Sequence, residues 1–208
     1  MKQPSIVIVD YGLGNTCSVW SAIKFLGYRK LKISSAYKDI VMADALILPG
    51  VGAFDACAKN IRERQLDTIL NEAVLVKRKP ILGVCVGMQL MATISEENGE
   101  HFGFNWIPGR VVKLTPGTSY AVPHVGWNDI RCLQQDSLFS ALTDNPNFYF
   151  DHSYQYQCDA RYISAQCDYG QPVTAAIVRA NIHGVQFHPE KSQTNGLKVF
   201  RSFFNSIV

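Results

Sequence analysis

The sequence is poor in charge and lacks a cluster of basic residues. Lys and Arg number 20 and Asp and Glu number 17 among 208 residues, so the formal net charge is only +3. The chain therefore offers no basic face of the kind that neutralises nucleic-acid phosphates. Apolar residues make up 47% and charged residues 18%, which excludes an intrinsically disordered chain. Nucleic acid is not expected as the main partner.

Long apolar runs are also missing. The longest, Ile81–Ile94, is too short to span a bilayer and contains Gln89. Only residues 6–9 form an apolar run before Asp10, so we expect no signal-peptide core. These features predict a cytoplasmic protein that does not bind membranes.

The six cysteines include no C-x-x-C pair, which argues against a zinc site or a thioredoxin-type site. Their even number is compatible with disulfides. A chain of this size, however, buries roughly 70% of its unfolded surface and needs no cross-links. Without an export signal, we expect free thiols. The cysteines lie at positions 17, 57, 85, 132, 158 and 167.

The two halves of the chain have different patterns. In the first half, expected strands at 5–10, 30–34, 44–50 and 80–84 alternate with expected helices at 20–26, 53–76 (broken near 65) and 87–94. This alternation predicts an α/β fold with a mostly parallel sheet flanked by helices. In the second half, expected strands at 147–150, 162–167, 173–179 and 182–188 have no helices between them and predict an antiparallel addition. A last helix is expected at 195–207, and the absence of a linker predicts one domain over residues 1–208.

One cysteine lies in a distinct motif. Gly83-Val84-Cys85-Val86-Gly87 follows an expected strand and precedes an expected helix, which is the cysteine form of the nucleophile elbow. The glycines permit a sharp turn without clashing Cβ atoms, and the first N–H groups of a helix favour a thiolate. A buried cysteine between two packing glycines is the alternative.

A reactive thiol needs a base and a group that orients that base. His188-Pro189-Glu190 ends an apolar run, and extended backbone directs positions 188 and 190 to the same side. The carboxylate could then fix the imidazole tautomer and stabilise imidazolium. The alternative is a histidine at a strand end beside a solvated glutamate.

Acyl transfer also requires donors for an oxyanion. The N–H of Val86 is one candidate, because it follows the nucleophile directly. The second is expected from the glycine-containing segment 49–52, which could instead serve only to reverse the chain.

Longer motifs give a resemblance that spans nearly the whole chain. Gly83–Gln89 and Gly184–Ser192 resemble class I glutamine amidotransferase domains. Further segments are similar to the glutaminase subunits of imidazole glycerol phosphate synthases: Asp10–Asn15, Pro49–Phe54, Ile107–Arg110, Pro123–Asn128 and His152–Tyr154. The resemblance implies a glutaminase that uses no metal and no cofactor.

The resemblance also implies roles for individual residues. Cys85 would attack glutamine, His188 would transfer protons, and Glu190 would orient His188. Val51, Gly52 and Val86 match oxyanion-hole positions. The positions that match glutamine-binding residues are Gly50, Gln89, Glu97, Ser153 and Tyr154.

Such glutaminases deliver ammonia to a (β/α)8-barrel cyclase, so the resemblance implies a heterodimer. The cyclase makes imidazole glycerol phosphate and AICAR in histidine biosynthesis. The residues that match positions at that interface are His124, Trp127, Asn128 and Tyr149.

The chain departs from the usual pattern at a few positions: Val86, Asp151, Gln155 and Gln157. Because of these departures, one alternative is a paralogous glutaminase that supplies ammonia for amidino-sugar formation in surface polysaccharides. A catalytically silent regulatory subunit is less favoured, because Cys85, His188 and Glu190 are all present. A different cysteine hydrolase on a similar fold is less favoured because of the H-P-E spacing and Gln89.

Overall fold

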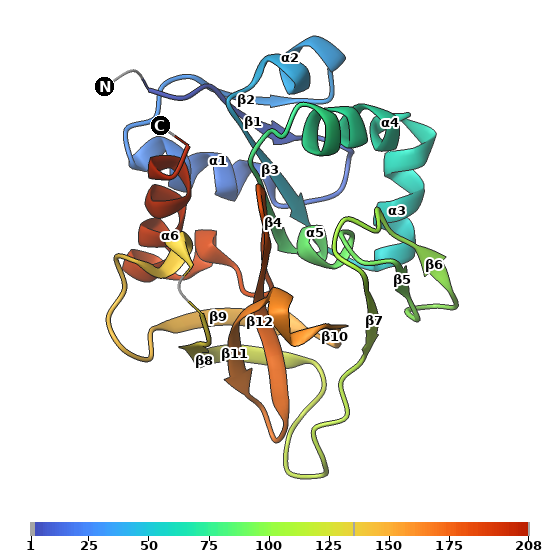
Figure 1. The fold of residues 1–208 in the computed structure, drawn as a ribbon. Helices are drawn as coiled ribbons and strands as arrows, with labels where there is room; N and C mark the ends of the chain where they lie inside the picture. Colours follow the sequence, from blue (N-terminus) through green and yellow to red (C-terminus); the bar gives the residue numbers. More distant parts are fainter. Residues whose placement is uncertain (1–2, 135, 208) are drawn as a thin grey trace.

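A computed structural model describes residues 3–134 and 136–207. Within these residues, nine strands form one sheet with the order β2-β1-β3-β4-β13-β12-β11-β8-β9 (Figure 1). The strands in this order are β2 (Leu31–Ser34), β1 (Ile6–Val9), β3 (Ala45–Gly50), β4 (Ile81–Cys85), β13 (Ile182–Val185), β12 (Pro172–Arg179), β11 (Ile163–Asp168), β8 (His124–Cys132) and β9 (Asn147–His152).

The sheet changes from parallel to antiparallel pairing along its width. Strands β2, β1, β3, β4 and β13 pair in parallel, whereas β12, β11, β8 and β9 each pair antiparallel with the preceding neighbour. The predicted α/β fold with an antiparallel addition is thereby confirmed. Strand β8, for which the sequence pattern gave no expectation, links the addition to β9.

Helices flank the parallel part on both sides (Figure 1). Helices α1 and α6 lie together on one side, and α3 and α4 lie on the other. The predicted break near residue 65 is confirmed, because Gln65 has a left-handed φ of 57° between α3 and α4. The helices are α1 (Thr16–Phe25), α2 (Tyr37–Met42), α3 (Phe54–Glu63), α4 (Leu66–Asn71), the π-helix η1 (Glu72–Val76), α5 (Val86–Gln89), the 3-10 helices η2 (Ser137–Phe139), η3 (Ala160–Tyr162) and η4 (Pro189–Lys191), and α6 (Gln193–Asn205).

The helix predicted at 87–94 was wrong in length. Helix α5 ends at Gln89, because the following carbonyls bond to another loop: Leu90 accepts from Phe104 at 2.8 Å and Met91 accepts from Trp106 at 2.9 Å. The chain then enters a small second sheet that the sequence pattern did not predict. Its strand order is β10 (Tyr154–Cys158), β7 (Gly109–Lys113), β5 (Ile94–Ser95) and β6 (His101–Phe102).

The strand predicted at 182–188 also ends early, at Val185. The backbone N–H of Gln186 still reaches β12, donating to Ala175 at 2.8 Å, but the N–H of His188 donates to Tyr149 on β9 at 2.9 Å. Residues 186–188 therefore cross from the parallel part of the sheet toward β9. Within residues 3–134 and 136–207, no helix is long and apolar enough to cross a membrane.

Candidate active site

Cys85 occupies a strained turn between β4 and α5. Its φ of 55° and ψ of −115° are unfavourable for a residue with a side chain. A Cβ at Gly87 would lie 1.8 Å from the carbonyl oxygen of Leu48, and one at Gly83 would lie 2.6 Å from that of Gly87. The predicted sharp strand-to-helix turn and its need for glycine are confirmed. Because α5 is a single turn, its dipole contributes little to the thiolate.

His188 and Glu190 lie side by side at the start of η4. The Nδ1 atom of His188 is 2.8 Å from Oε1 of Glu190, and the two side chains are only 3% and 1% exposed. The alternative of a solvated glutamate is therefore wrong. The other carboxylate oxygen of Glu190 has no hydrogen-bond partner within the described chain. Glu190 thus holds the imidazole through one of its carboxylate oxygens, in a short and buried contact.

The imidazole of His188 interacts with the sulfur of Cys85 as well as with Glu190. Burial by itself lowers the pKa of His188, but hydrogen bonds to Cys85 and Glu190, together with their negative charges, raise it to about 10. The imidazolium form therefore persists at neutral pH beside the sulfur. A thiolate–imidazolium pair is the arrangement that activates a cysteine nucleophile.

A cavity of about 270 Å³ opens over this sulfur. It brings together residues from distant parts of the chain. Those predicted from the sequence are Val51, Gly52, Cys85, Val86, Gln89, Glu97, Ser153, Tyr154 and His188, and those not predicted are Pro123, Asp151, His152 and Lys191. Gly50 does not border the cavity, because it packs against the elbow, where a Cβ would lie 2.5 Å from the N atom of Gly87.

The segment predicted to contribute oxyanion donors is fixed by two side chains beneath it. The hydroxyl of Tyr11 donates to the carbonyl of Pro49 at 2.7 Å, and the thiol of Cys57 donates to that of Val51 at 3.5 Å. Gly52 follows with a left-handed φ of 89°. Val86 opens α5, so its N–H has no partner within that helix.

Two side chains predicted to bind glutamine form hydrogen bonds within the protein. Glu97 accepts a hydrogen bond from the N–H of Phe54 at 2.9 Å, and burial raises the pKa of this carboxyl. The Nε2 atom of Gln89 donates to the carbonyl of Tyr154 at 3.2 Å and to Oε1 of Gln186 at 3.0 Å. The amide oxygen of Gln89 is the part of this side chain not engaged by these two bonds.

Comparison with known proteins identifies the family of this chain. The family model described as glutamine amidotransferase class-I matches residues 7–207. The chain belongs to the class I glutamine amidotransferases. The predicted family is confirmed, and the chain is an enzyme of this class. The arrangement of Cys85, His188 and the cavity is consistent with that chemistry.

The chain is also similar to named relatives and shares its fold with a solved structure. The chain is 46% identical over 200 residues, 96% of its length and 94% of the relative's, to "Imidazole glycerol phosphate synthase subunit HisH 2" of Vibrio vulnificus. It is 43% identical to the protein of the same name from Pseudomonas aeruginosa, covering 95% of this chain and 98% of that one. The solved structure of PurLQS from Thermotoga maritima shares the fold with a TM-score of 0.71 and 16% identity, covering 100% of this chain and 100% of that one.

In this amidotransferase, two buried histidines lie beside the cavity. Nδ1 of His152 is 2.8 Å from the carbonyl oxygen of Tyr154, and its Nε2 is 3.0 Å from Nδ1 of His124. Because a carbonyl only accepts, His152 must donate through Nδ1 and accept through Nε2. Burial lowers the pKa of both histidines to about 4. Both rings are therefore neutral at pH 7.

The residues expected at a partner interface separate into exposed and buried positions. Trp127 on β8 is 47% exposed and lies edge-on to Tyr149 on β9, with 6.2 Å between ring centroids. Asn128 donates to the carbonyl of Asp168 at 2.8 Å. His124 is only 2% exposed and lies beneath this surface, so it does not present its ring to a partner. Of the four expected residues, the exposed Trp127 and the half-buried Tyr149 present aromatic rings there.

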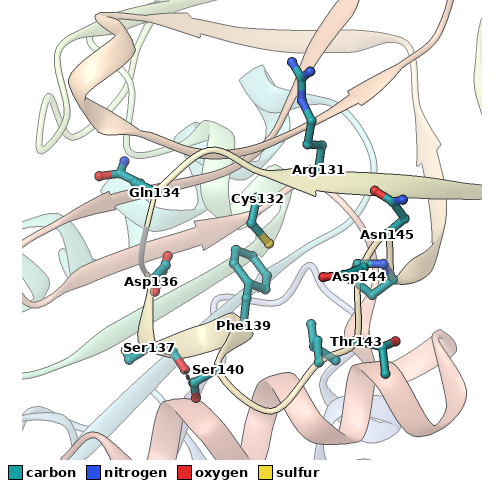
Figure 2. A pocket seen from close by; sticks show the side chains of 12 residues that line it. Arg131, Cys132, Gln134, Asp136, Ser137, Phe139, Ser140, Thr143, Asp144 and Asn145 are labelled. Carbon is teal, nitrogen blue, oxygen red and sulfur yellow. Dashed lines mark hydrogen bonds between the residues drawn. The ribbon is translucent and has the colours of Figure 1, made fainter.

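The amidotransferase also has a larger cavity elsewhere, shown in Figure 2. It measures about 820 Å³, and its lining includes Arg131, Asp136 and Asn145. None of the residues predicted for catalysis borders it. Its size therefore does not make it the candidate active site, because the paired nucleophile and base lie at the smaller cavity.

Two groups that contact the sulfur were not predicted from the sequence. The thiol of Cys85 donates to the backbone carbonyl of Asp151 at 3.8 Å, and Nε2 of Gln186 donates to the sulfur at 3.7 Å. The carbonyl has no sequence signal. Gln186, however, lies two residues before His188, and the alternation that linked His188 to Glu190 also places it on their side.

Within the described part of the chain, no group of three or more His, Cys, Asp and Glu side chains is placed to hold a metal ion. All six cysteines are free thiols.

Proposed function

We propose that this enzyme is the glutaminase subunit of an imidazole glycerol phosphate synthase and supplies ammonia for histidine biosynthesis. The observation that carries the proposal is the match to subunits of that name, at 46% and 43% identity over 94% and 98% of their lengths. The geometry of Cys85, His188 and Glu190 supports an active glutaminase, and it argues against a silent regulatory role. We also propose that residues 1–208 form one domain in the cytoplasm, since both halves share one sheet and the thiols are free.

The first half of the proposed reaction forms a thioester. The thiolate of Cys85 attacks the side-chain amide carbon of glutamine, and the carbonyl becomes an oxyanion. The N–H groups of Val86 and of residues 51–52 stabilise this charge. His188 gives its proton to the departing nitrogen, so ammonia leaves and a γ-glutamyl thioester to Cys85 remains.

The second half hydrolyses the thioester. His188, now neutral, takes a proton from water as the hydroxide attacks the thioester carbon. The oxyanion forms again, and its collapse releases glutamate and the thiolate. Glu190 keeps the imidazole oriented through Nδ1 and stabilises imidazolium in both halves.

Substrate recognition is proposed for the polar groups around the cavity. Glu97 pairs with the α-ammonium group of glutamine, and the free amide oxygen of Gln89 accepts a hydrogen bond from the substrate. Ser153 and Tyr154 contribute backbone groups. Gly50 supports the elbow rather than touching the substrate, because it lies outside the cavity lining.

We propose that the partner is a (β/α)8-barrel cyclase that forms a heterodimer with this chain and receives ammonia through a path shielded from water. In bulk water at neutral pH ammonia is mostly ammonium, which is not nucleophilic. Trp127, Asn128 and Tyr149 supply the contact surface. This surface joins the active site through β9, since the carbonyl of Tyr149 binds the N–H of His188.

The test combines the chain with the histidine-pathway cyclase of the same organism and measures glutamate release and imidazole glycerol phosphate formation. Both are expected to require Cys85. The Cys85→Ala variant should lose glutamine-dependent synthesis but keep synthesis from added ammonium salts, because ammonia then bypasses the glutaminase. If glutamate release required instead the cyclase of an amidino-sugar pathway, the paralogous function would replace this proposal.

A further inference from the structure

A fully buried amide lies beside the sulfur of Cys85. Gln186 has an exposed fraction of 0%, and its Nε2 is 3.7 Å from the sulfur. Its backbone is fixed to the sheet, because its N–H donates to the carbonyl of Ala175 at 2.8 Å. The side chain therefore meets the sulfur from a rigid position.

The direction of this amide is determined by a backbone carbonyl. The oxygen of Tyr154 can only accept, so Gln89 must present its NH₂ group there. The same NH₂ group donates to Gln186 at 3.0 Å, so Gln186 must present Oε1 to Gln89. The remaining NH₂ group of Gln186 then points at Cys85. Rotating this amide by 180° would place two donors against each other.

The remaining groups around the sulfur favour different charge states of Cys85. The carbonyl of Asp151 accepts the thiol proton and favours the neutral form, whereas His188 favours the thiolate. Tyr11 and Cys57 are near enough to interact with Cys85, and burial raises the pKa of each, so both stay neutral at pH 7. The other charged groups are Glu190, behind His188, and Glu97, Asp151 and Lys191, which line the cavity.

We propose that Gln186 is a further catalytic residue, whose side-chain amide donates a hydrogen bond to the sulfur of Cys85 and stabilises its thiolate. An N–H donor binds a negative sulfur more strongly than a neutral one. Gln186 therefore offsets the carbonyl of Asp151 and acts together with His188. This inference rests on the proposed role of Cys85 as the nucleophile, and it concerns how that nucleophile is charged.

The experiment measures the rate of Cys85 alkylation by iodoacetamide from pH 5 to 10, without glutamine or partner. Mass spectrometry of the peptide that contains Cys85 separates it from the exposed Cys17 and Cys132. The variant Gln186→Met removes the donor and keeps a similar volume. Gln166→Met is the matched control, because Gln166 is a half-buried glutamine on β11 that makes no contact with the sulfur.

We expect Gln186→Met to move the midpoint of the alkylation profile to higher pH by about one unit, with a rate about tenfold lower below the midpoint and little changed above it. A purely structural defect would change the rate at every pH. The profile of Gln166→Met should coincide with the wild type. Coincidence of the Gln186→Met profile with both would overturn the proposal.

A second variant covers the case in which Gln186→Met does not fold, as judged by circular dichroism. Gln186→Leu removes the donor without adding a charge. Its profile should move in the same direction as that of Gln186→Met, and an unmoved profile would again overturn the proposal. Alkylation needs neither glutamine nor cyclase, so the two tests are independent. The glutamate-release assay can fail while the alkylation profiles support this inference, and the profiles can contradict it while glutamate is released.

Discussion

The reactivity of Cys85 follows from the few atoms around its sulfur. The imidazolium of His188 and the amide of Gln186 both favour a negative sulfur, whereas the carbonyl of Asp151 favours the thiol. Glu190 does not border the cavity but sets the charge of His188. The charge on the sulfur is therefore controlled by two side chains from the segment after β13 and by one backbone carbonyl of β9.

Replacing Glu190 with glutamine should separate the effect of the negative charge of Glu190 from the effect of its hydrogen bond to His188. An amide oxygen can still accept from Nδ1 of His188, but the negative charge that helps to raise its pKa is lost. We expect the pKa of His188 to fall and glutamine turnover with the partner to drop about 10³- to 10⁴-fold. Glu96→Gln, which removes an exposed ion pair with Arg110, is the control and should leave turnover unchanged. Wild-type turnover in Glu190→Gln would contradict the role of Glu190.

The same shift affects stability at high pH. The pKa of His188 is raised from 6.5 to about 10 in the folded chain, so the folded state binds the proton more tightly. This contribution to stability is fully present below pH 6.5 and is lost as the pH rises through 10.

The buried pair His124 and His152 should have the opposite effect at low pH. Their pKa values are lowered to about 4, so the unfolded chain binds protons that the folded chain excludes. The stability from these neutral rings is present above pH 6.5 and is lost as the pH falls toward 4. Urea unfolding should therefore give a smaller free energy of unfolding at pH 5 than at pH 7.

A double variant isolates the histidine pair. His124→Asn combined with His152→Gln should weaken the loss of stability between pH 7 and pH 5, because two of the excluded protons are removed. His101→Gln, on β6 in the small sheet, is the control and should keep the wild-type dependence. An unchanged pH dependence in the double variant would show that the pair is not its source.

At the scale of elements, η4 is fastened to β9 through the hydroxyl of Ser192 and a backbone hydrogen bond of His188. Ser192 donates to the carbonyl of His188 at 2.6 Å and accepts from the N–H of Tyr149 at 3.0 Å. The N–H of His188 also donates to the carbonyl of Tyr149. The turn that carries the base is thus tied to β9, which pairs with the strand that carries the exposed Trp127.

Ser192→Ala should weaken this junction. It leaves the N–H of Tyr149 without its partner and removes one of the two donors to the carbonyl of His188, which keeps the N–H of Lys191 at 3.0 Å. The expected cost is about 1–3 kcal/mol in the free energy of unfolding. Urea unfolding measures this loss, and glutamine turnover should fall as well because the imidazole is less well held. Ser206→Ala, at the exposed end of α6, is the control and should change stability little. Equal stability of the two variants would contradict the junction.

At the scale of the whole molecule, the sequence predicted the features that depend on local pattern. The elbow at Cys85 and the paired His188 and Glu190 are each contained in five residues or fewer, so spacing alone indicated them. The parallel core followed from alternating strands and helices. Their convergence was expected from the chemical need of a thiol for a base and from the family resemblance, because local pattern cannot join residues that lie 103 positions apart.

Features that depend on distant partners were not predictable. The apolar run after Gln89 indicated a longer helix, yet residues 103–107 supply partners that end it. Strands β5 and β6 have two residues each, too short for any periodic signal. The role of Gln186 depends on Gln89, 97 residues earlier in the chain. The burial of His124 depends on β9, which covers it only in the folded sheet.

The partner surface gives the last prediction. Trp127 is 47% exposed on β8, beside Tyr149, whose backbone binds η4. Large, half-exposed aromatic residues are frequent anchors of protein interfaces. Trp127→Ala should therefore raise the Kd for the cyclase about thirtyfold, a loss of about 2 kcal/mol, as measured by isothermal titration calorimetry. Met42→Ala is the control, because Met42 is 70% exposed on α2, far from β8 and β9 (Figure 1). Equal affinity of the two variants would place the interface elsewhere on the molecule.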